Sequence, residues 1–204
     1  EYTEPYVWLC VFGGRADACG QEPAETDTAG AALSNTPLRY VQTQWTTKDG
    51  LPVNAINDIA QTEDGHLWLA TYDGLVRFDG TEVTVFRSAQ HEGLPNNRVL
   101  SLRARADGLW VQTESRHLVR VRDGRFTTVA EGVNVLREDR DGHLWLGTQT
   151  GVSIYREGAL RRVSPGVLSA HVRALLVTED GTLWAGTKDE GVYFRSPNGR
   201  VRHL

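Results

Sequence analysis

Apolar and polar residues alternate along short stretches of this chain, and the alternation returns at regular intervals. In the stretch HLWLAT, residues 66–71, the two leucines face one way while Trp68 and Ala70 face the other. This period of two is typical of a β-strand with one buried side. No stretch of the surrounding unit has the period and the end signals of a helix. The first unit therefore predicts four short strands, at about residues 55–61, 66–71, 75–79 and 82–87.

The first unit belongs to a repeat that occurs four times, with about 40 residues between successive copies. Each copy has an Asp-Gly pair, then a Trp, and then a Thr three residues after the Trp. Asp-Gly favours a tight hairpin, because such turns need positive φ angles. Four-stranded antiparallel units of this length are typical of propeller blades. We predict an all-β fold, a β-propeller, with blades at about residues 54–87, 97–130, 133–163 and 171–204.

The repeated tryptophans are interpreted as packing residues rather than as stacking sites for a ligand. They are Trp68, Trp110, Trp145 and Trp184, and small residues mostly follow two positions later. A large flat side chain fills the space between neighbouring blades, while small residues suit the taper of a blade.

A second motif predicts an extra outer strand ahead of the first blade. Gly93-Leu94-Pro95 leads into the second blade, and Gly50-Leu51-Pro52 stands in the same relation to the first. Residues 38–46 then read as a closing outer strand without inner strands of its own. The propeller, residues 38–204, would be an incomplete ring of about four blades plus this orphan strand; the alternative is a four-bladed ring with one redundant strand. An open ring leaves a blade face exposed and favours association, for example as a homodimer.

The first 32 residues differ in character from the repeats. A short apolar run is followed by small polar residues, and Ala16-Asp17-Ala18 fits a signal-peptidase site. Residues 1–32 are therefore interpreted as a truncated signal peptide of an exported, periplasmic protein; the alternative is a chance apolar run unrelated to export. A disulfide between Cys10 and Cys19 can form only if this segment is retained in the mature protein.

Composition and motifs exclude several function classes. The net charge is −4, and the 22 Lys and Arg are scattered, which argues against a nucleic-acid partner. Asp139 and Asp141 resemble part of a calcium loop, but Arg137 occupies its first ligand position. The six His lack metal-ligand spacing. Because no nucleotide loop or nucleophile elbow is present either, we expect no cofactor, no metal and no catalytic residue in this portion.

A ligand site, if present, is expected where the innermost strands begin. In a propeller these strands line the central channel, and the loops between second and third strands lie at the same end. Amide and guanidinium groups there suit hydroxyl-rich or anionic ligands. The candidates are Asn54, Asn57, Tyr72, Asn97, Arg98, Arg116, Asn134, Gln149, His171, Arg173 and Lys188.

The stretches WTTKDGLPVNAI and DGHLWLATYDGLVRFDG resemble the two-component regulator propeller repeat. The resemblance covers about residues 38–204; it departs at Ser115-Arg116-His117, where the family usually has a Gly, and at an insertion before Gly191. It implies a periplasmic sensor domain of a membrane-bound histidine kinase or diguanylate cyclase, with a small or oligomeric ligand, in some members a saccharide. The output module and the membrane anchor would belong to the same full-length protein. The alternatives are a propeller enzyme of the streptogramin lyase type and a protein-interaction propeller.

Overall fold

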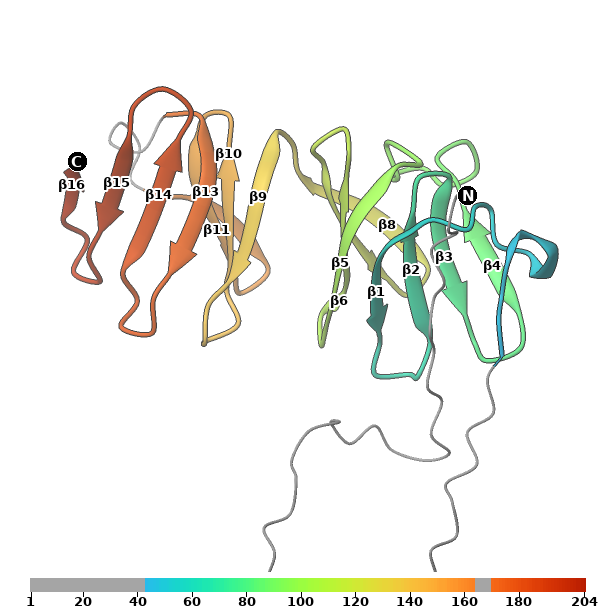
Figure 1. The fold of residues 1–204 in the computed structure, drawn as a ribbon. Coiled ribbons are helices and arrows are strands. Elements are labelled where there is room, and N and C mark those ends of the chain that lie inside the picture. Colours follow the sequence, from blue (N-terminus) through green and yellow to red (C-terminus); the bar gives the residue numbers. More distant parts are fainter. Residues whose placement is uncertain (1–42, 164–169) are drawn as a thin grey trace, which may run out of the picture.

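The computed structural model describes residues 43–163 and 170–204. Within these residues, sixteen strands form four separate sheets, and each sheet is an antiparallel meander of four strands in chain order. The sheets follow one another across the molecule as blades 1 to 4 (Figure 1). The prediction of an all-β propeller of four-stranded blades is confirmed.

The strand bounds lie close to those that the alternation predicts in the first unit. Blade 1 contains β1 Ile56–Gln61, β2 Leu67–Thr71, β3 Gly74–Phe78 and β4 Val83–Phe86. Blade 2 contains β5 Val99–Arg105, β6 Gly108–Thr113, β7 Leu118–Arg122 and β8 Arg125–Ala130. Blade 3 contains β9 Val133–Glu138, β10 Leu144–Thr148, β11 Gly151–Arg156 and β12 Ala159–Arg162. Blade 4 contains β13 Val172–Val177, β14 Leu183–Thr187, β15 Val192–Arg195 and β16 Val201–His203.

The two outermost strands of blades 2 and 3 are joined by tight turns that need positive φ angles. Asp123 and Gly124 have φ angles of 51° and 72°, and Glu157 and Gly158 have φ angles of 52° and 76°. Two successive positive φ angles match the right-handed twist of the flanking strands, and a glycine at the second position adopts one without steric conflict.

The indole N–H explains why the hairpin turn and the tryptophan recur together. Trp68 Nε1 donates to Thr62 Oγ1 at 3.1 Å, and Trp145 Nε1 donates to Asp139 Oδ2 at 2.9 Å. Trp110 Nε1 donates to Asp107 Oδ1 at 3.0 Å. Each indole packs between blades, and its one polar atom is satisfied by the turn that precedes it.

The repeated threonine closes the loop between the second and third strands of each blade. Thr71 Oγ1 donates to the carbonyl of Gly74 at 2.7 Å, and Thr148 Oγ1 donates to that of Gly151 at 2.9 Å. Thr71 is completely buried, so this hydrogen bond also satisfies a hydroxyl that has no access to water.

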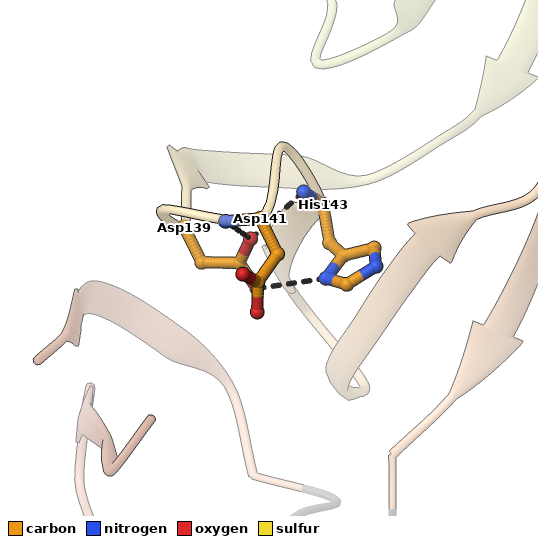
Figure 2. A group of neighbouring side chains, drawn as sticks. All are labelled: Asp139, Asp141 and His143. Carbon is orange, nitrogen blue, oxygen red and sulfur yellow. Dashed lines mark hydrogen bonds and ion pairs between the residues drawn. The ribbon is translucent and has the colours of Figure 1, made fainter. Parts of the chain in front are cut away.

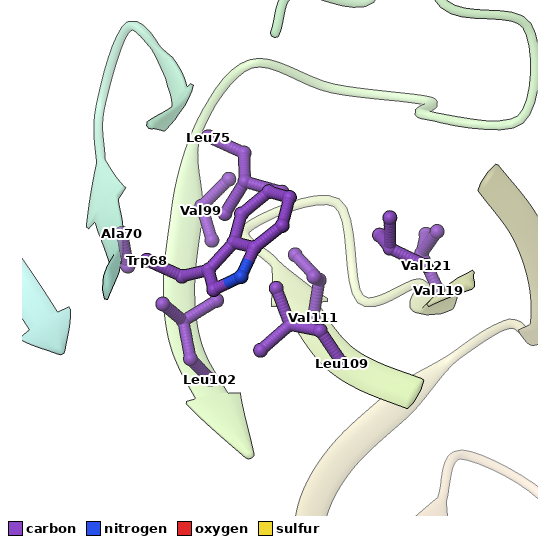
Figure 3. Close-up of a cluster of buried hydrophobic side chains, with 9 residues drawn as sticks. All are labelled: Trp68, Ala70, Leu75, Val99, Leu102, Leu109, Val111, Val119 and Val121. Carbon is purple, nitrogen blue, oxygen red and sulfur yellow. The ribbon is translucent and has the colours of Figure 1, made fainter. Parts of the chain in front are cut away.

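The core of the molecule lies between the blades, in three packed faces that we call seams 1–2, 2–3 and 3–4 after the blades they join. In seam 1–2, Trp68 of blade 1 packs against Val99, Leu102 and Val111 of blade 2 (Figure 3). Trp110 lies in the cluster of seam 2–3, and Trp145 lies in that of seam 3–4. These three tryptophans are 8%, 1% and 7% exposed, which confirms that they pack between blades.

Close approach between blades depends on the small residue two positions after the tryptophan. A Cβ atom on Gly147 would lie 2.5 Å from Val135 Cγ1 and 2.7 Å from Val172 Cγ1, at seam 3–4. No side chain fits there without moving blade 4, because van der Waals contact between carbon atoms needs about 3.5 Å or more. The glycine therefore sets how closely blades 3 and 4 pack.

The face of blade 1 that points away from blade 2 is partly covered by the chain that precedes it. Trp45 lies edge-on to Phe78 with 4.8 Å between ring centroids, and Leu51 is 7% exposed in the same cluster. A one-turn 3₁₀-helix, Thr47–Asp49, joins them. Residues 43–46 contain no strand. The rest of the predicted closing strand, residues 38–42, and the predicted leader, residues 1–32, lie outside the described residues, so both hypotheses stay predictions.

Replacing different tryptophans of the repeat by alanine should lower the stability of the fold by unequal amounts. Trp110→Ala should lower the free energy of unfolding by about 3–5 kcal/mol, because it empties a closed seam. Trp184 faces away from blade 3, since its neighbours Leu183 and Ala185 pack into seam 3–4, and it is only half-buried. Trp184→Ala should therefore lower the free energy by about 1 kcal/mol. Urea unfolding followed by circular dichroism measures both values, and equal losses would contradict the seam interpretation.

Candidate functional site

The structure brings the two predicted sets of site residues to one end of the blades, which we call the mouth. Backbone hydrogen bonds join the residues entering the inner strands to the loops between the second and third strands. Glu114 N donates to Arg98 O at 2.8 Å, and Lys188 N donates to His171 O at 2.8 Å. Val133 N of blade 3 donates to Arg116 O of blade 2 at 2.9 Å. The residues that enter the inner strands and the loops between the second and third strands therefore lie at the same end of these blades, as the sequence analysis predicts.

Each inner strand carries a β-bulge near its start, at Asn57, Leu100, Asn134 and Arg173. A bulge leaves one residue outside the ladder and turns its side chain in a new direction. Asn57 Nδ2 donates to the carbonyl of Val99 on the next blade at 2.7 Å, and Asn134 Nδ2 donates to that of Val172 at 2.9 Å. We call these two contacts the amide clamps. Both asparagines were predicted as ligand residues, and the structure gives both a partner across a seam.

Seam 2–3 lacks an amide clamp because Leu100 stands at the bulge of β5. Leu100 is 37% exposed, and an aliphatic side chain cannot donate to the carbonyl of Val133. Gln112 Nε2 reaches that carbonyl instead, at a longer distance of 3.5 Å. The inner edge of seam 2–3 is therefore more weakly joined than the inner edges of seams 1–2 and 3–4.

Two cavities lie along seam 2–3. One, of about 440 Å³, opens at the mouth between Arg116, His117, Glu131 and Gln149. The other, of about 360 Å³, lies between β8 and the strands of blade 3 and shares Glu131 with the first.

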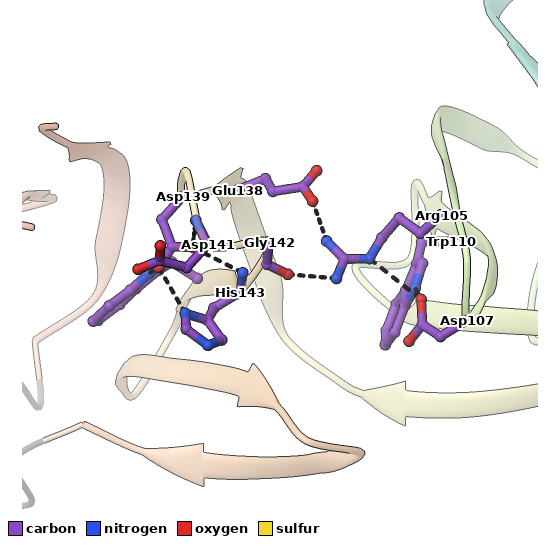
Figure 4. Close-up of polar contacts among 9 residues, drawn as sticks. Arg105, Asp107, Trp110, Glu138, Asp139, Asp141, Gly142 and His143 are labelled. Carbon is purple, nitrogen blue, oxygen red and sulfur yellow. Dashed lines mark hydrogen bonds and ion pairs between the residues drawn. The ribbon is translucent and has the colours of Figure 1, made fainter.

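The far end of seam 2–3, away from the mouth, is held by polar contacts, of which those of Arg105 are drawn in Figure 4. The guanidinium of Arg105 forms an ion pair with Glu138 and donates to the carbonyl of Gly142, both in blade 3. Arg120 donates to the hydroxyl of Tyr155 at 2.8 Å. The Arg105 side chain is 18% exposed, so its charge is only partly screened by water. Blades 2 and 3 are thus joined by charged contacts at the far end, and at the mouth by the backbone hydrogen bond from Val133 to Arg116 without an amide clamp.

A first group of mouth residues is internally paired. Arg98 forms an ion pair with Glu114 at 2.9 Å, and its guanidinium lies 5.2 Å from the centre of the Tyr72 ring. Asn97 Oδ1 accepts from the backbone N–H of Ser88 at 2.7 Å. Asn54, likewise, accepts from the backbone N–H of Thr47 at 2.9 Å. These two asparagines act as local caps.

A second group of mouth residues comes from blades 2 and 4 and is cationic. Burial lowers the pKa of His171, and the positive charges of Arg173, Lys188 and Arg116 lower it further. Asp189 acts in the opposite direction but does not outweigh them. Hydrogen bonds connect the Arg116 loop to blade 4 through blade 3, because Val133 N donates to Arg116 O and Asn134 Nδ2 donates to Val172 O. Gln149 of blade 3 lines the mouth cavity beside Arg116.

One group of side chains has the composition of a metal site, and one of its carboxylates is already hydrogen-bonded within the turn. Asp139, Asp141 and His143 lie together in the first turn of blade 3 (Figure 2). Asp139 Oδ1 accepts from two backbone N–H groups, and Asp139 Oδ2 accepts from Trp145 and lies 3.1 Å from His143 Nδ1. Burial acts to raise the pKa of Asp139, but the hydrogen bonds from Trp145 and His143 lower it overall. The Asp139 carboxylate therefore stabilises the turn.

Sequence reasoning missed the acidic residues of the mouth and the special place of Leu100. Glu114 and Glu131 line the mouth cavity, and neither belongs to the candidate set. The signal for Glu114 was available, because it follows Thr113 as Tyr72 follows Thr71. The signal for Leu100 is its alignment with Asn57 and Asn134, but its meaning depends on the bulge, which the sequence pattern does not reveal.

The repeats match a known family. Residues 50–73, 130–150 and 166–189 match the two component regulator propeller model. Three segments of the chain are thus similar to two-component regulator propeller repeats, as the sequence motifs indicated. Among curated proteins, no sequence matches the chain significantly.

Solved structures with a similar fold include extracellular domains of hybrid two-component systems from B. thetaiotaomicron. That of BT4673 is 25% identical with a TM-score of 0.58 over 81% of this chain and 23% of its own. That of BT3049 is 17% identical with a TM-score of 0.56, over 81% and 24%. YCF48 bound to D1 peptide is 14% identical with a TM-score of 0.53, over 81% and 56%. The chain spans about a quarter of the two-component domains.

In the described residues, no helix combines the length and the apolar character needed to cross a bilayer.

The clamp interpretation predicts that seam 2–3 can be strengthened by one substitution. Leu100→Asn should raise the free energy of unfolding by about 0.5–1 kcal/mol, because the new amide can donate to the carbonyl of Val133. Asn134→Leu should lower it by about 1 kcal/mol, since the carbonyl of Val172 loses its donor. Urea unfolding measures both. A loss of stability in Leu100→Asn equal to that in Asn134→Leu would show that bulge amides do not join blades.

Proposed function

We propose that this chain is part of the periplasmic, ligand-sensing propeller of a membrane-bound signalling protein. The observation that carries the proposal is the match of three segments to the two component regulator propeller model. The 25% identity to an extracellular domain of a hybrid two-component system supports it. Because the chain spans only part of such domains, the activity and partners of the whole protein belong to the proposal.

The output module, a histidine kinase or a diguanylate cyclase, would lie in the same full-length protein beyond a membrane anchor. This portion would bind a small or oligomeric ligand, for example a saccharide, and would carry out no catalysis itself.

Blade 4 offers a surface for a neighbour, since Trp184 and Leu176 lie opposite one another on its outward face and Leu176 is 56% exposed. A homodimer or a further blade would cover that face.

A ligand can act on such a propeller only through unequal affinity for two arrangements of the blades. Such a change would fall at seam 2–3, because its inner edge lacks an amide clamp while Arg105 holds its far end. A ligand at the mouth that contacts blade 2 together with blade 3 or blade 4 would favour the closed seam. The change would then pass along the ring toward the anchor.

Export and topology provide the test of this proposal. β-Lactamase inserted after Leu204 in the full-length protein should confer ampicillin resistance on a Gram-negative host, because the enzyme protects cells only from the periplasm. The same insertion in a variant lacking residues 1–32 should give sensitivity. Resistance combined with recovery of the fusion in the membrane fraction supports a membrane-bound sensor.

Two outcomes would count against the proposal. Sensitivity of cells carrying the full-length fusion would place these blades inside the cell. Resistance with the fusion wholly in the soluble periplasmic fraction would indicate a free-standing protein instead, and a lyase or an interaction propeller would become the leading hypothesis.

A further inference from the structure

The acidic side chains at the mouth are largely engaged, whereas several cations are not. Glu114 pairs with Arg98 at 2.9 Å, and Asp73 pairs with Arg87 at 3.0 Å. Glu190 accepts from the hydroxyl of Tyr193 at 2.7 Å.

In contrast, Arg116 and Arg173 form no ion pair with any acid in residues 43–163 and 170–204. Lys188 has only its exposed neighbour Asp189, at 3.7 Å. Glu131 lines the same cavity as Arg116 but does not pair with it. The mouth therefore holds two guanidinium groups without an ion pair, one on blade 2 and one on blade 4, although its formal positive and negative charges are equal in number on both blades.

Arg116 is held in a backbone conformation that favours glycine. Its φ angle is 63°, in the left-handed region, and non-glycine residues adopt this region rarely. Its N–H donates to Thr113 O at 2.9 Å and its carbonyl accepts from Val133 N at 2.9 Å, so the surrounding loop fixes the residue. An unfavourable backbone maintained in this way is more frequent at binding sites than elsewhere. It presents the Arg116 side chain at the mouth.

His171 adds an unsatisfied polar atom to the same group. His171 Nε2 is shielded from solvent and has no hydrogen-bond partner among the described atoms. Burial lowers the pKa of His171, and the charges of Arg173, Lys188 and Arg116 lower it further, which disfavours the charged form of the ring. An anion placed among these three cations would offset their effect on the ring and satisfy an N–H of the imidazole.

We propose that Arg116, Arg173 and Lys188 form an anion-binding site at the mouth, which takes a carboxylate, sulfate or phosphate group of the ligand. Guanidinium groups bind such oxyanions through charge-assisted hydrogen bonds. The anion would join blade 2 to blade 4 and so span seam 3–4 together with seam 2–3, the seam without an amide clamp. This proposal names the ligand chemistry for the proposed sensor and to that extent rests on it.

Nuclear magnetic resonance of the 204-residue chain tests the proposal with inorganic sulfate and with acetate, at an ionic strength held constant with sodium chloride. The chemical shifts of the His171 ring signals should change as sulfate or acetate is added and should reach a plateau. The pKa of His171 should also rise, because the bound anion stabilises the imidazolium. Arg116→Gln and Arg173→Gln should each weaken binding by at least about fivefold. Preference between the two anions identifies which group the ligand carries.

Arg122→Gln provides the matched control, because Arg122 lies at the opposite end of blade 2, is exposed and carries the same charge. It should bind the anion as the unmodified chain does. The proposal is overturned if sulfate and acetate leave the His171 signals unchanged, or if Arg116→Gln and Arg173→Gln bind as tightly as Arg122→Gln. Binding is measured without any signalling output, so its failure is separate from a failure of the export test.

Discussion

A four-stranded blade cannot bury both of its faces alone, and the rest of this structure depends on that constraint. Each sheet contributes one apolar face to each neighbour, and the buried tryptophans lie where two such faces meet. The hairpin turn, the indole and the loop-closing threonine recur together because the turn satisfies the indole N–H and the threonine fixes the next loop. The sequence motif therefore repeats because each blade packs against its neighbours in the same way.

The three seams solve this problem with different polar contacts. Asn57 and Asn134 join the inner edges of seams 1–2 and 3–4, whereas Leu100 leaves the inner edge of seam 2–3 without an amide donor. Arg105 and Arg120 hold the far end of that seam. Blades 1 and 2 and blades 3 and 4 thus form two pairs, and Arg116 and Arg173, which form no ion pair in the described residues, lie on opposite sides of the seam between them.

Much of this fold could be predicted from the sequence, because blade strands are specified by local signals. The alternation around Trp68 predicted every strand end of the first unit to within one residue of its observed position. The Asp-Gly pairs predicted the first turn of each blade. The gathering of Arg98, Arg116 and His171 at one end followed from propeller geometry alone.

What the sequence could not provide depends on contacts between blades. A bulge is defined by pairing with the neighbouring strand, so nothing in the residues around Asn57 or Asn134 shows that their amides turn across a seam. For the same reason Leu100 looked like an ordinary strand residue. The ion pair from Arg105 to Glu138 joins residues far apart in the chain, and neither stands in a recognisable motif.

Native-state hydrogen exchange at increasing urea concentration tests the central claim, that the seams hold the blades together in two pairs. If the account is right, β1–β8 share one opening free energy and β9–β16 share another, while the mouth residues of seam 2–3 exchange at a lower free energy than either. A single opening free energy shared by all four sheets, with equal protection at the three seams, would contradict it.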